Sequence, residues 1–281
     1  MNYPPDDHLL RALATVIQLE EGGTASAWLP ITPHLCGDGG GVRLGVLAML
    51  ADVVGASNLS EFIHPDRMAT VSLSLQSQGA ARQGPLIARS SLLRRGSRQL
   101  IVSVELRDGQ GSEDFARGEV VAQGLLGFSR LARLPEHPDL PAPTQRPSRS
   151  EMAHPAARLD RPLLERAGVR VLDEDAGVVE IDNHDWVRNS FGTLNGGALA
   201  LLVELAGERT ARAQTGPHAV ALDLELYYVG QSGAGPIRSR ATRLRVGDGH
   251  CLSRVEVRDA GASDKLMAVG NVHAGPQPGG S

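Results

Sequence analysis

An internal duplication constrains the fold of this 281-residue chain more than any other feature of its sequence. Residues 86–108 align with residues 237–259 at an offset of 151 positions, and identical pairs in this alignment include Arg89 and Arg240, Gly96 and Gly247, Glu105 and Glu256, and Asp108 and Asp259. Further upstream the offset is 152, where Gly40, Gly45 and Asp52 match Gly192, Gly197 and Glu204. This order of matches predicts two tandem copies of one domain.

Both copies show the same pattern of predicted elements. Apolar residues alternate with polar ones in residues 71–75, 101–106, 222–226 and 252–257, which is typical of half-buried strands. Before these strands, each copy has one strongly apolar segment, Val46–Val54 or Ala198–Ala206, which is apolar on nearly all sides and is therefore predicted to be a buried helix. An antiparallel sheet wrapped around one buried helix is the simplest packing of these parts, so we expect an α+β fold.

The composition places the boundaries of the two copies. Residues 1–130 are assigned to the first copy and residues 163–274 to the second. Between them, residues 131–162 are rich in proline and polar side chains, which predicts an extended, semi-rigid linker. The tail at residues 275–281 is rich in glycine and proline and is predicted to be disordered.

Charge and composition argue against several classes of protein. A net charge of −4 and an aromatic content of 3% do not favour a nucleic-acid-binding surface. No uninterrupted apolar run is long enough to predict a membrane span, and the first residues are acidic where a signal peptide is basic. We therefore expect a cytoplasmic protein. The histidines show no metal-binding spacing, so no metal site is predicted.

The sequence NSFGTLNGGALALLVE, residues 189–204, carries the chemistry expected of a site. Gly196 and Gly197 open the predicted helix, where free N–H groups point outward and the helix dipole favours negative charge. Two such donors aimed at a developing alkoxide form an oxyanion hole. Asn189 and Asn195 add side-chain donors on the approach, and Glu204 supplies an acid.

One helix cannot supply both the donors and the acid for a single carbonyl carbon. Gly197 and Glu204 are seven residues apart, or about 10 Å along a helix axis. Donors and acid that act together must come from different copies. Two antiparallel helices side by side bring Asp52 of the first copy to residues 189–197 of the second. The reverse pairing sets Glu204 against residues 34–45.

Each of these residues also has a purely structural interpretation. Asp52 and Glu204 are interpreted either as functional carboxylates or as members of salt bridges, because an unpaired charge in an apolar helix is costly. Asn189 is interpreted either as a donor or as a turn cap. The two glycines are interpreted either as donors to a ligand or as sites of close helix packing.

The motif, with Asn189, Asn195, Gly196, Gly197 and Glu204 in this spacing at the mouth of an apolar helix, resembles that of the acyl-CoA thioesterases of the PaaI-like and 4-hydroxybenzoyl-CoA groups. The resemblance covers nearly the whole chain as a fused double hotdog. It implies that a glycine N–H, of Gly196 or Gly197, polarises the thioester carbonyl while Asn189 and Asn195 orient the substrate. It further implies that Asp52 is the acid, acting either as a nucleophile or as a general base toward water. It also implies that no cofactor is needed beyond the coenzyme A thioester substrate, and that the chains form a homo-oligomer.

The two copies depart from that family pattern to different degrees. The family's usual histidine is Asn195 in the second copy and Arg43 in the first. The first copy has also lost the preceding asparagine, replaced by Gly37, and the first glycine of the pair, replaced by Leu44. We therefore expect one competent site per chain, built around Asp52, with the Glu204 site vestigial or structural.

Two arginine clusters are candidates for holding coenzyme A phosphates. They are formed by Arg94, Arg95 and Arg98 and by Arg243 and Arg245. Arginine binds phosphate through forked hydrogen bonds, but a solvated hairpin is the alternative interpretation of both clusters.

The leading functional hypothesis is hydrolysis of an acyl-CoA thioester at a composite site. Two alternatives stay open. A non-catalytic acyl-CoA-binding protein is suggested by the degraded first motif, and tight binding without cleavage distinguishes it. A hotdog dehydratase or hydratase requires a carboxylate–histidine pair, and neither predicted helix entrance carries that histidine.

Overall fold

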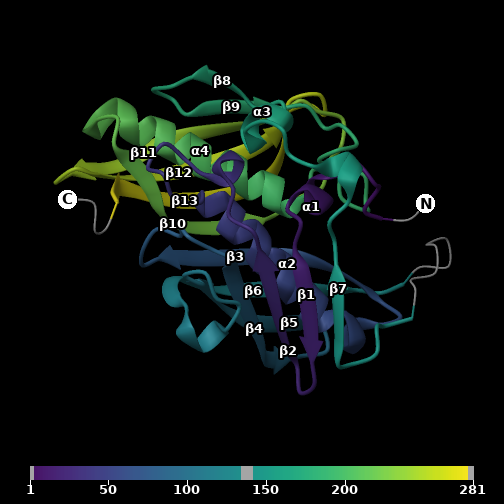
Figure 1. Ribbon diagram of the computed structural model, residues 1–281. Coiled ribbons are helices and arrows are strands. Elements are labelled where there is room, and N and C mark those ends of the chain that lie inside the picture. The colour runs from purple at the N-terminus through teal and green to yellow at the C-terminus, as the bar shows by residue number, and fades with distance from the viewer. Residues whose placement is uncertain (1–2, 134–141, 278–281) are drawn as a thin grey trace.

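The computed structural model describes residues 3–133 and 142–277 and contains one 13-stranded sheet (Figure 1). Its strand order is β7-β1-β2-β4-β5-β6-β3-β10-β13-β12-β11-β9-β8. The first copy contains α1 (Leu9–Ala12), β1 (Val16–Glu20), β2 (Thr24–Leu29), η1 (Pro33–Leu35), α2 (Leu44–Ile63), β3 (Arg67–Ser77), β4 (Leu86–Arg95), β5 (Gln99–Asp108), η2 (Phe115–Arg117) and β6 (Glu119–Leu131).

The second copy repeats this order. It contains α3 (Leu163–Arg166), β8 (Arg170–Asp173), β9 (Val178–Ile181), α4 (Gly196–Thr215), β10 (Ala219–Tyr228), β11 (Ile237–Gly247), β12 (His250–Asp259) and β13 (Lys265–Pro276). Each copy is an antiparallel sheet curved around one long helix, so the predicted double hotdog is confirmed. The four predicted strand segments and both predicted helices lie inside the observed elements.

The two half-sheets join along β3 and β10. These strands pair antiparallel, with Leu75 opposite Leu224 and Leu73 opposite Leu226. All four leucines are buried, because they alternate toward the helices that the sheet encloses. The join makes a single sheet, with α2 and α4 side by side near its centre.

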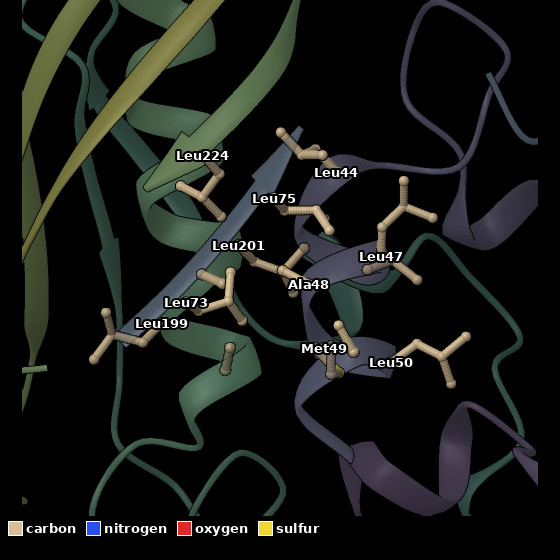
Figure 2. Packing of buried hydrophobic residues seen from close by; sticks show 14 of the residues in the cluster. Leu44, Leu47, Ala48, Met49, Leu50, Leu73, Leu75, Leu199, Leu201 and Leu224 are labelled. Carbon is tan, nitrogen blue, oxygen red and sulfur yellow. The ribbon is translucent and has the colours of Figure 1, made fainter. Parts of the chain in front are cut away.

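The helices α2 and α4 pack against each other, with Met49 of α2 and Leu201 of α4 among the buried side chains between them (Figure 2). A glycine in each helix allows this close approach. A side-chain carbon built on Gly197 would lie 2.4 Å from Met49 Cγ, and one on Gly45 would lie 2.8 Å from Leu201 Cα. Close helix packing, one of the two interpretations of the paired glycines, is therefore the observed setting of Gly197. The equivalent Gly45 has the same setting in the first copy.

Helix α2 is apolar enough to pass a membrane-span test by length and composition alone. Of the 18 most apolar consecutive residues of this helix, 61% are buried inside the protein. They pack against α4 and the first half-sheet. Its apolar character therefore fits the core helix of a hotdog domain, and it does not indicate a membrane span.

The segment between the copies is partly built into the sheet. Strand β7 (Ser148–Glu151) pairs antiparallel with β1 at the sheet edge, and η3 (Pro155–Ala157) follows it. This part of the predicted linker is thus an ordered edge strand, because β1 offers it unpaired backbone groups. Gly275 and Pro276 end β13, which corrects their assignment to a disordered tail, and residues 278–281 lie outside the described part of the chain.

The duplicated Asp108 and Asp259 have matching structural roles in the two copies. Asp108 accepts hydrogen bonds from the backbone N–H groups of residues 82, 83, 84 and 110 at 2.7–3.2 Å. Asp259 accepts from those of Ala234 and Gly261 at 3.0 Å. Burial acts to raise the pKa of Asp108, but the four backbone donors more than offset it and the pKa is lowered. Each aspartate therefore fastens the turn before a sheet strand.

Asp108→Ala is expected to lower the free energy of unfolding by about 3 kcal/mol, because it leaves several buried N–H groups without an acceptor. The deficit should be largest above the unfolded carboxyl pKa of 3.8 and should shrink as the pH falls through the lower folded value. Urea titrations at pH 7 and pH 3 measure this change, with the exposed Asp160→Ala as control. Equal stability of Asp108→Ala and wild type at pH 7 would contradict the assignment.

Candidate active site between the two copies

Asp52 of α2 faces the start of α4, as the cross-copy argument predicts. A side-chain carbon built on Gly196 would lie 3.4 Å from Asp52 Oδ2 and 3.4 Å from the Tyr228 hydroxyl. Thr70 of β3 donates a hydrogen bond of 2.7 Å to Asp52 Oδ1. Burial raises the pKa of Asp52 to about 6, against the opposing effect of the Thr70 hydrogen bond. The other carboxylate oxygen is thus left facing Gly196.

The helix start itself offers one free backbone donor at this place. Asn195 is the N-cap of α4, and its Oδ1 accepts the N–H of Gly197 at 2.9 Å. Gly197 is buried against Met49, whereas Gly196 is partly accessible. Among the described residues, none accepts the N–H of Gly196. The geometry therefore singles out Gly196, rather than Gly197, as the backbone donor available to a ligand.

Asn189 shapes the loop that leads to the helix. Its Oδ1 accepts the N–H groups of Phe191 and Thr193, and its Nδ2 donates to Thr193 Oγ1 at 2.8 Å and to the Leu194 carbonyl oxygen at 3.4 Å. Both amide hydrogens are thus used inside the loop. This contact set favours the turn-forming interpretation of Asn189, and its donation to the substrate stays a prediction.

Three residues near Asp52 were missed by the sequence analysis. Thr70 was missed because a β-bulge between Thr70 and Ser72 interrupts the alternation of β3 and turns Thr70 inward. Tyr228 of β10 donates a hydrogen bond of 2.9 Å to the carbonyl oxygen of Gly196. Burial raises the pKa of Tyr3 to about 12, with Asn195 acting to lower it and the charge of Asp52 to raise it. Each is far from the motif in sequence, so the motif gave no signal for them.

A hollow of about 300 Å³ lies between the C-terminal end of α2 and the motif loop. It is lined from α2 by Ser60 and Ile63, from β3 by Met68, and from the motif loop by Phe191. Polar and charged side chains, among them His64, Asp66 and Arg67, share this lining with the apolar ones. The hollow therefore offers a mixed surface between the end of α2 and the motif loop.

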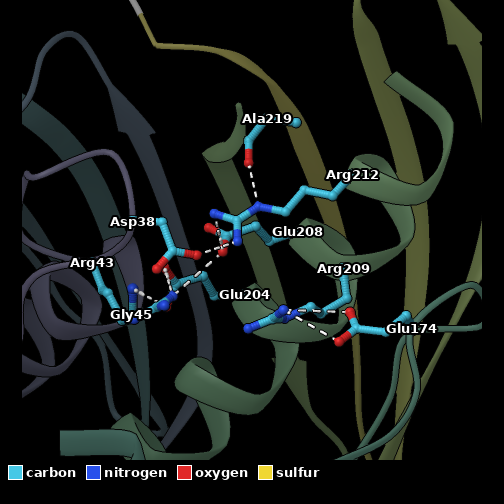
Figure 3. A network of polar contacts seen from close by, with 9 residues as sticks. All are labelled: Asp38, Arg43, Gly45, Glu174, Glu204, Glu208, Arg209, Arg212 and Ala219. Carbon is cyan, nitrogen blue, oxygen red and sulfur yellow. Dashed lines mark hydrogen bonds and ion pairs between the residues drawn. The ribbon is translucent and has the colours of Figure 1, made fainter. Parts of the chain in front are cut away.

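The equivalent place in the first copy is filled by charged side chains (Figure 3). Arg43 Nη1 lies 3.5 Å from Glu204 Oε1 and 3.6 Å from Glu208 Oε1. Arg212 extends the network, with Nη2 2.8 Å from Glu208 Oε1 and Nη1 paired with Asp38. Arg43 occupies the position that Asn195 holds in the second copy. The salt-bridge interpretation of Glu204 is therefore the observed one.

Glu204 also occupies the backbone donors of its own site. Its Oε2 accepts the N–H of Gly45 at 3.0 Å, and the neighbouring N–H of Leu44 also acts to lower the pKa of the carboxyl group. These two N–H groups are equivalent to those of Gly197 and Gly196. Burial raises the pKa of Glu204, while Arg43 acts to lower it. The longer side chain of glutamate thus places a carboxylate where a substrate oxygen would bind.

The predicted arginine clusters lie on exposed parts of the sheet. Arg94 and Arg95 end β4, and the guanidinium of Arg95 lies 5.1 Å from the centre of the Phe62 ring, near the end of α2 that lines the hollow. Arg243 and Arg245 are exposed on β11 of the second copy. Their binding to coenzyme A phosphates stays a prediction. Within residues 3–133 and 142–277, no group of three or more histidine, cysteine or acidic side chains is arranged to hold a metal ion.

Residues 191–264 match the family model described as "Thioesterase superfamily". Over these residues the second copy is similar to the thioesterase superfamily. This match begins in the motif loop and runs through α4 to the turn after β12. A search of curated proteins finds no match to the chain.

Solved structures that resemble the chain along its whole length share its fold. They include an acyl-ACP thioesterase from Bacteroides thetaiotaomicron, with a TM-score of 0.59, 10% identity and coverage of 90% of this chain and 98% of that one. The tesB protein of Mycobacterium avium subsp. paratuberculosis has a TM-score of 0.58 and 10% identity, with coverage of 93% and 96%. A hot dog fold protein from Alicyclobacillus acidocaldarius has a TM-score of 0.55 and 14% identity, with coverage of 94% and 96%.

The superfamily match and the double hotdog fold together indicate a thioester hydrolase. The resemblance inferred from the helix-entry motif is confirmed at this level.

Proposed function

We propose that this thioesterase-superfamily protein hydrolyses an acyl-CoA thioester to the free acid and coenzyme A at the Asp52–Gly196 site. The observation that carries the proposal is the meeting of Asp52 from one copy with the free N–H of Gly196 from the other. One carbonyl group can contact both Asp52 and the Gly196 N–H. It could not contact Glu204 and the glycine N–H groups of the same helix, because these lie two helical turns apart.

The Gly196 N–H is placed to polarise the thioester carbonyl. It belongs to the first turn of α4, where the helix dipole favours the negative charge that develops on the oxygen. The Tyr228 hydroxyl donates to the carbonyl oxygen of the same residue and so holds its peptide unit in place. The hollow beside Phe191 is the place for the flexible part of the substrate in this proposal.

Asp52 acts as the general base in this proposal. A water molecule attacks the thioester carbon as it loses a proton to Asp52, and the carbonyl oxygen becomes an oxyanion. The carbon–sulfur bond then breaks, the carbonyl re-forms, and the departing thiolate takes the proton back from Asp52. A carboxyl pKa of about 6 leaves Asp52 ionised at neutral pH yet basic enough to accept that proton.

Thiol release from a panel of thioesters tests the function and the substrate class. The panel combines short, long, branched and aryl acyl groups, each presented on coenzyme A and on N-acetylcysteamine. We expect release from at least one acyl group, with a kcat/KM at least tenfold higher for the coenzyme A ester. Equal rates on both thiols would contradict the coenzyme A assignment. Tight binding without release from any ester would favour the non-catalytic binding protein instead.

A further inference from the structure

A second hollow, of about 660 Å³, shares no lining residue with the Asp52–Gly196 site. Three segments that are distant in sequence form it: α1 with the turn after it, the loop from β2 into η1, and the part of the predicted linker around η3. Helix α1 packs against η3, and the buried side chains of Leu13 and Leu35 give the hollow an apolar lining. Its volume lies within the range of roughly 300–1,000 Å³ that is usual for small-molecule sites.

Every ionisable side chain among the described residues that line this hollow is basic. These side chains belong to Arg11, His34, His154 and Arg158, in a chain whose net charge is −4. Asp6 Oδ1 lies 3.7 Å from His154 Nε2, but Asp6 is 74% exposed and does not line the hollow. A concave surface with charge of one sign concentrates the electric field and attracts ligands of the opposite sign. The hollow therefore favours an anion.

The two arginines of this hollow have no carboxylate partner within residues 3–133 and 142–277. The Nε of Arg11 donates to the carbonyl oxygens of Pro4 and Pro5 at 3.1 and 2.9 Å. These bonds orient the guanidinium and leave its Nη groups without an acceptor among the described residues. Arg158 is exposed at the end of η3, and its side chain makes no hydrogen bond or ion pair with that part of the chain. Both guanidinium groups are thus available to a ligand.

We propose that this hollow binds a phosphate group carried by a partly apolar molecule of nucleotide size, with Arg11 and Arg158 as the phosphate-binding residues. Arginine stays charged in proteins, and its forked donors match the oxygens of a phosphate. Two unpaired guanidinium groups balance the two charges of a phosphate monoester, whereas a carboxylate requires only one. The lining of Leu13 and Leu35 takes the uncharged part of the molecule. The phosphates of coenzyme A and those of a free nucleotide share this chemistry.

The segments that form the hollow are bonded to the entrances of both copies. The Leu9 N–H of α1 donates to the Trp186 carbonyl oxygen at 2.9 Å, and His8 Nε2 lies 2.7 Å from the Arg188 carbonyl oxygen, just before the motif loop. On the other side, the carbonyl oxygen of Leu35 accepts the N–H of Arg43 at 3.1 Å. A phosphate bound in the hollow would therefore contact segments that lie beside the proposed active site and beside its first-copy equivalent.

Calorimetric titration of the full chain tests this proposal with inorganic phosphate, adenosine 3′,5′-bisphosphate, coenzyme A and hexanoate as probes. We expect the bisphosphate and coenzyme A to bind the wild type, and Arg158→Met to weaken both about tenfold because it removes a charged hydrogen-bond donor. Its melting temperature should be unchanged, since the Arg158 side chain has no partner in the described fold. Arg117→Met is the matched control, because Arg117 is exposed on η2 and pairs with Asp114. It should bind like the wild type.

Two results would overturn the proposal. One is the absence of binding by every phosphate probe, or tighter binding of hexanoate than of any of them. The other is an affinity for the bisphosphate that falls in Arg95→Met and not in Arg158→Met, because the phosphate would then lie on the exposed cluster of β4. Since binding is measured without turnover, a wild type that binds the bisphosphate but cleaves no ester would refute the proposed function alone.

Kinetics of Arg158→Met separate the two sources of the phosphate. A KM that rises about tenfold for the coenzyme A ester, with an unchanged KM for the N-acetylcysteamine ester, would assign the hollow to the phosphates of the substrate itself. An unchanged KM for both esters, together with weaker binding of the bisphosphate, would assign it to a separate nucleotide. In both cases the hollow binds phosphate through Arg158.

Discussion

Asp52→Asn is expected to lower kcat for thioester hydrolysis by about a thousandfold while the protein stays folded, because asparagine cannot accept the proton of the attacking water. Glu204→Gln should retain at least half of the wild-type kcat, since the Glu204 carboxylate bonds to the helix start of its own site. Steady-state kinetics of both variants on the best ester of the panel measure the difference. Comparable losses in the two variants would contradict a single active site per chain.

The pH profile gives the same prediction a second readout. Asp52 must be ionised to act as a base, so kcat/KM should rise about tenfold per pH unit below its pKa of about 6 and level off above it. The Thr70 hydrogen bond lowers that pKa. Thr70→Val should therefore move the inflection to higher pH. An inflection that Thr70→Val leaves in place would assign the titration to another group.

The duplication was enough to predict the fold and the partner of each carboxylate. The matched glycines and acids, at a nearly constant offset, predicted two equivalent helices. The rise of a helix per turn excluded a site whose donors and acid both come from one helix. The observed contact of Asp52 with Gly196, and of Glu204 with Gly45, follows from those two facts alone. Residues that repeat in sequence occupy equivalent places in space because both copies pack the same elements.

The contacts of the motif residues could not be predicted in the same way. The sequence shows that Gly196 and Gly197 are adjacent glycines, but only the position of Met49 shows that Gly197 is the one needed for packing. Asn189 could donate to a ligand or close a turn, and the choice depends on where residues 191–194 fold back.

The positions of site residues outside the motif depend on structural features that leave no recognisable pattern in the sequence. Thr70 faces Asp52 because of a bulge, which shifts the alternation that the prediction assumed. The N-terminal segment around His8 lies on the motif loop of the second copy, a contact between residues 180 positions apart. Local periodicity carries no information about such a contact.

Arg43→Met is expected to lower the free energy of unfolding by about 3–5 kcal/mol at pH 8, because it leaves the Glu204 carboxylate buried without its cation. Methionine keeps most of the volume of the side chain, so the loss reports charge more than packing. Urea titration measures it, with the exposed Arg243→Met as control. The double variant Arg43→Met/Glu204→Gln should recover most of the loss, since it removes both members of the pair.

The pH dependence of this loss identifies its cause. Burial raises the folded pKa of Glu204 above its unfolded value of 4.5, and removal of Arg43 raises it further. A raised carboxyl pKa means that the folded state loses stability as the pH rises from the unfolded to the folded value. Arg43→Met should therefore cost much less at pH 5 than at pH 8. An equal loss of stability at both pH values would assign the loss to packing. A larger loss at pH 8 would show that the charge of Glu204 causes it, as expected if a buried ion pair fills the first-copy entrance in place of a substrate.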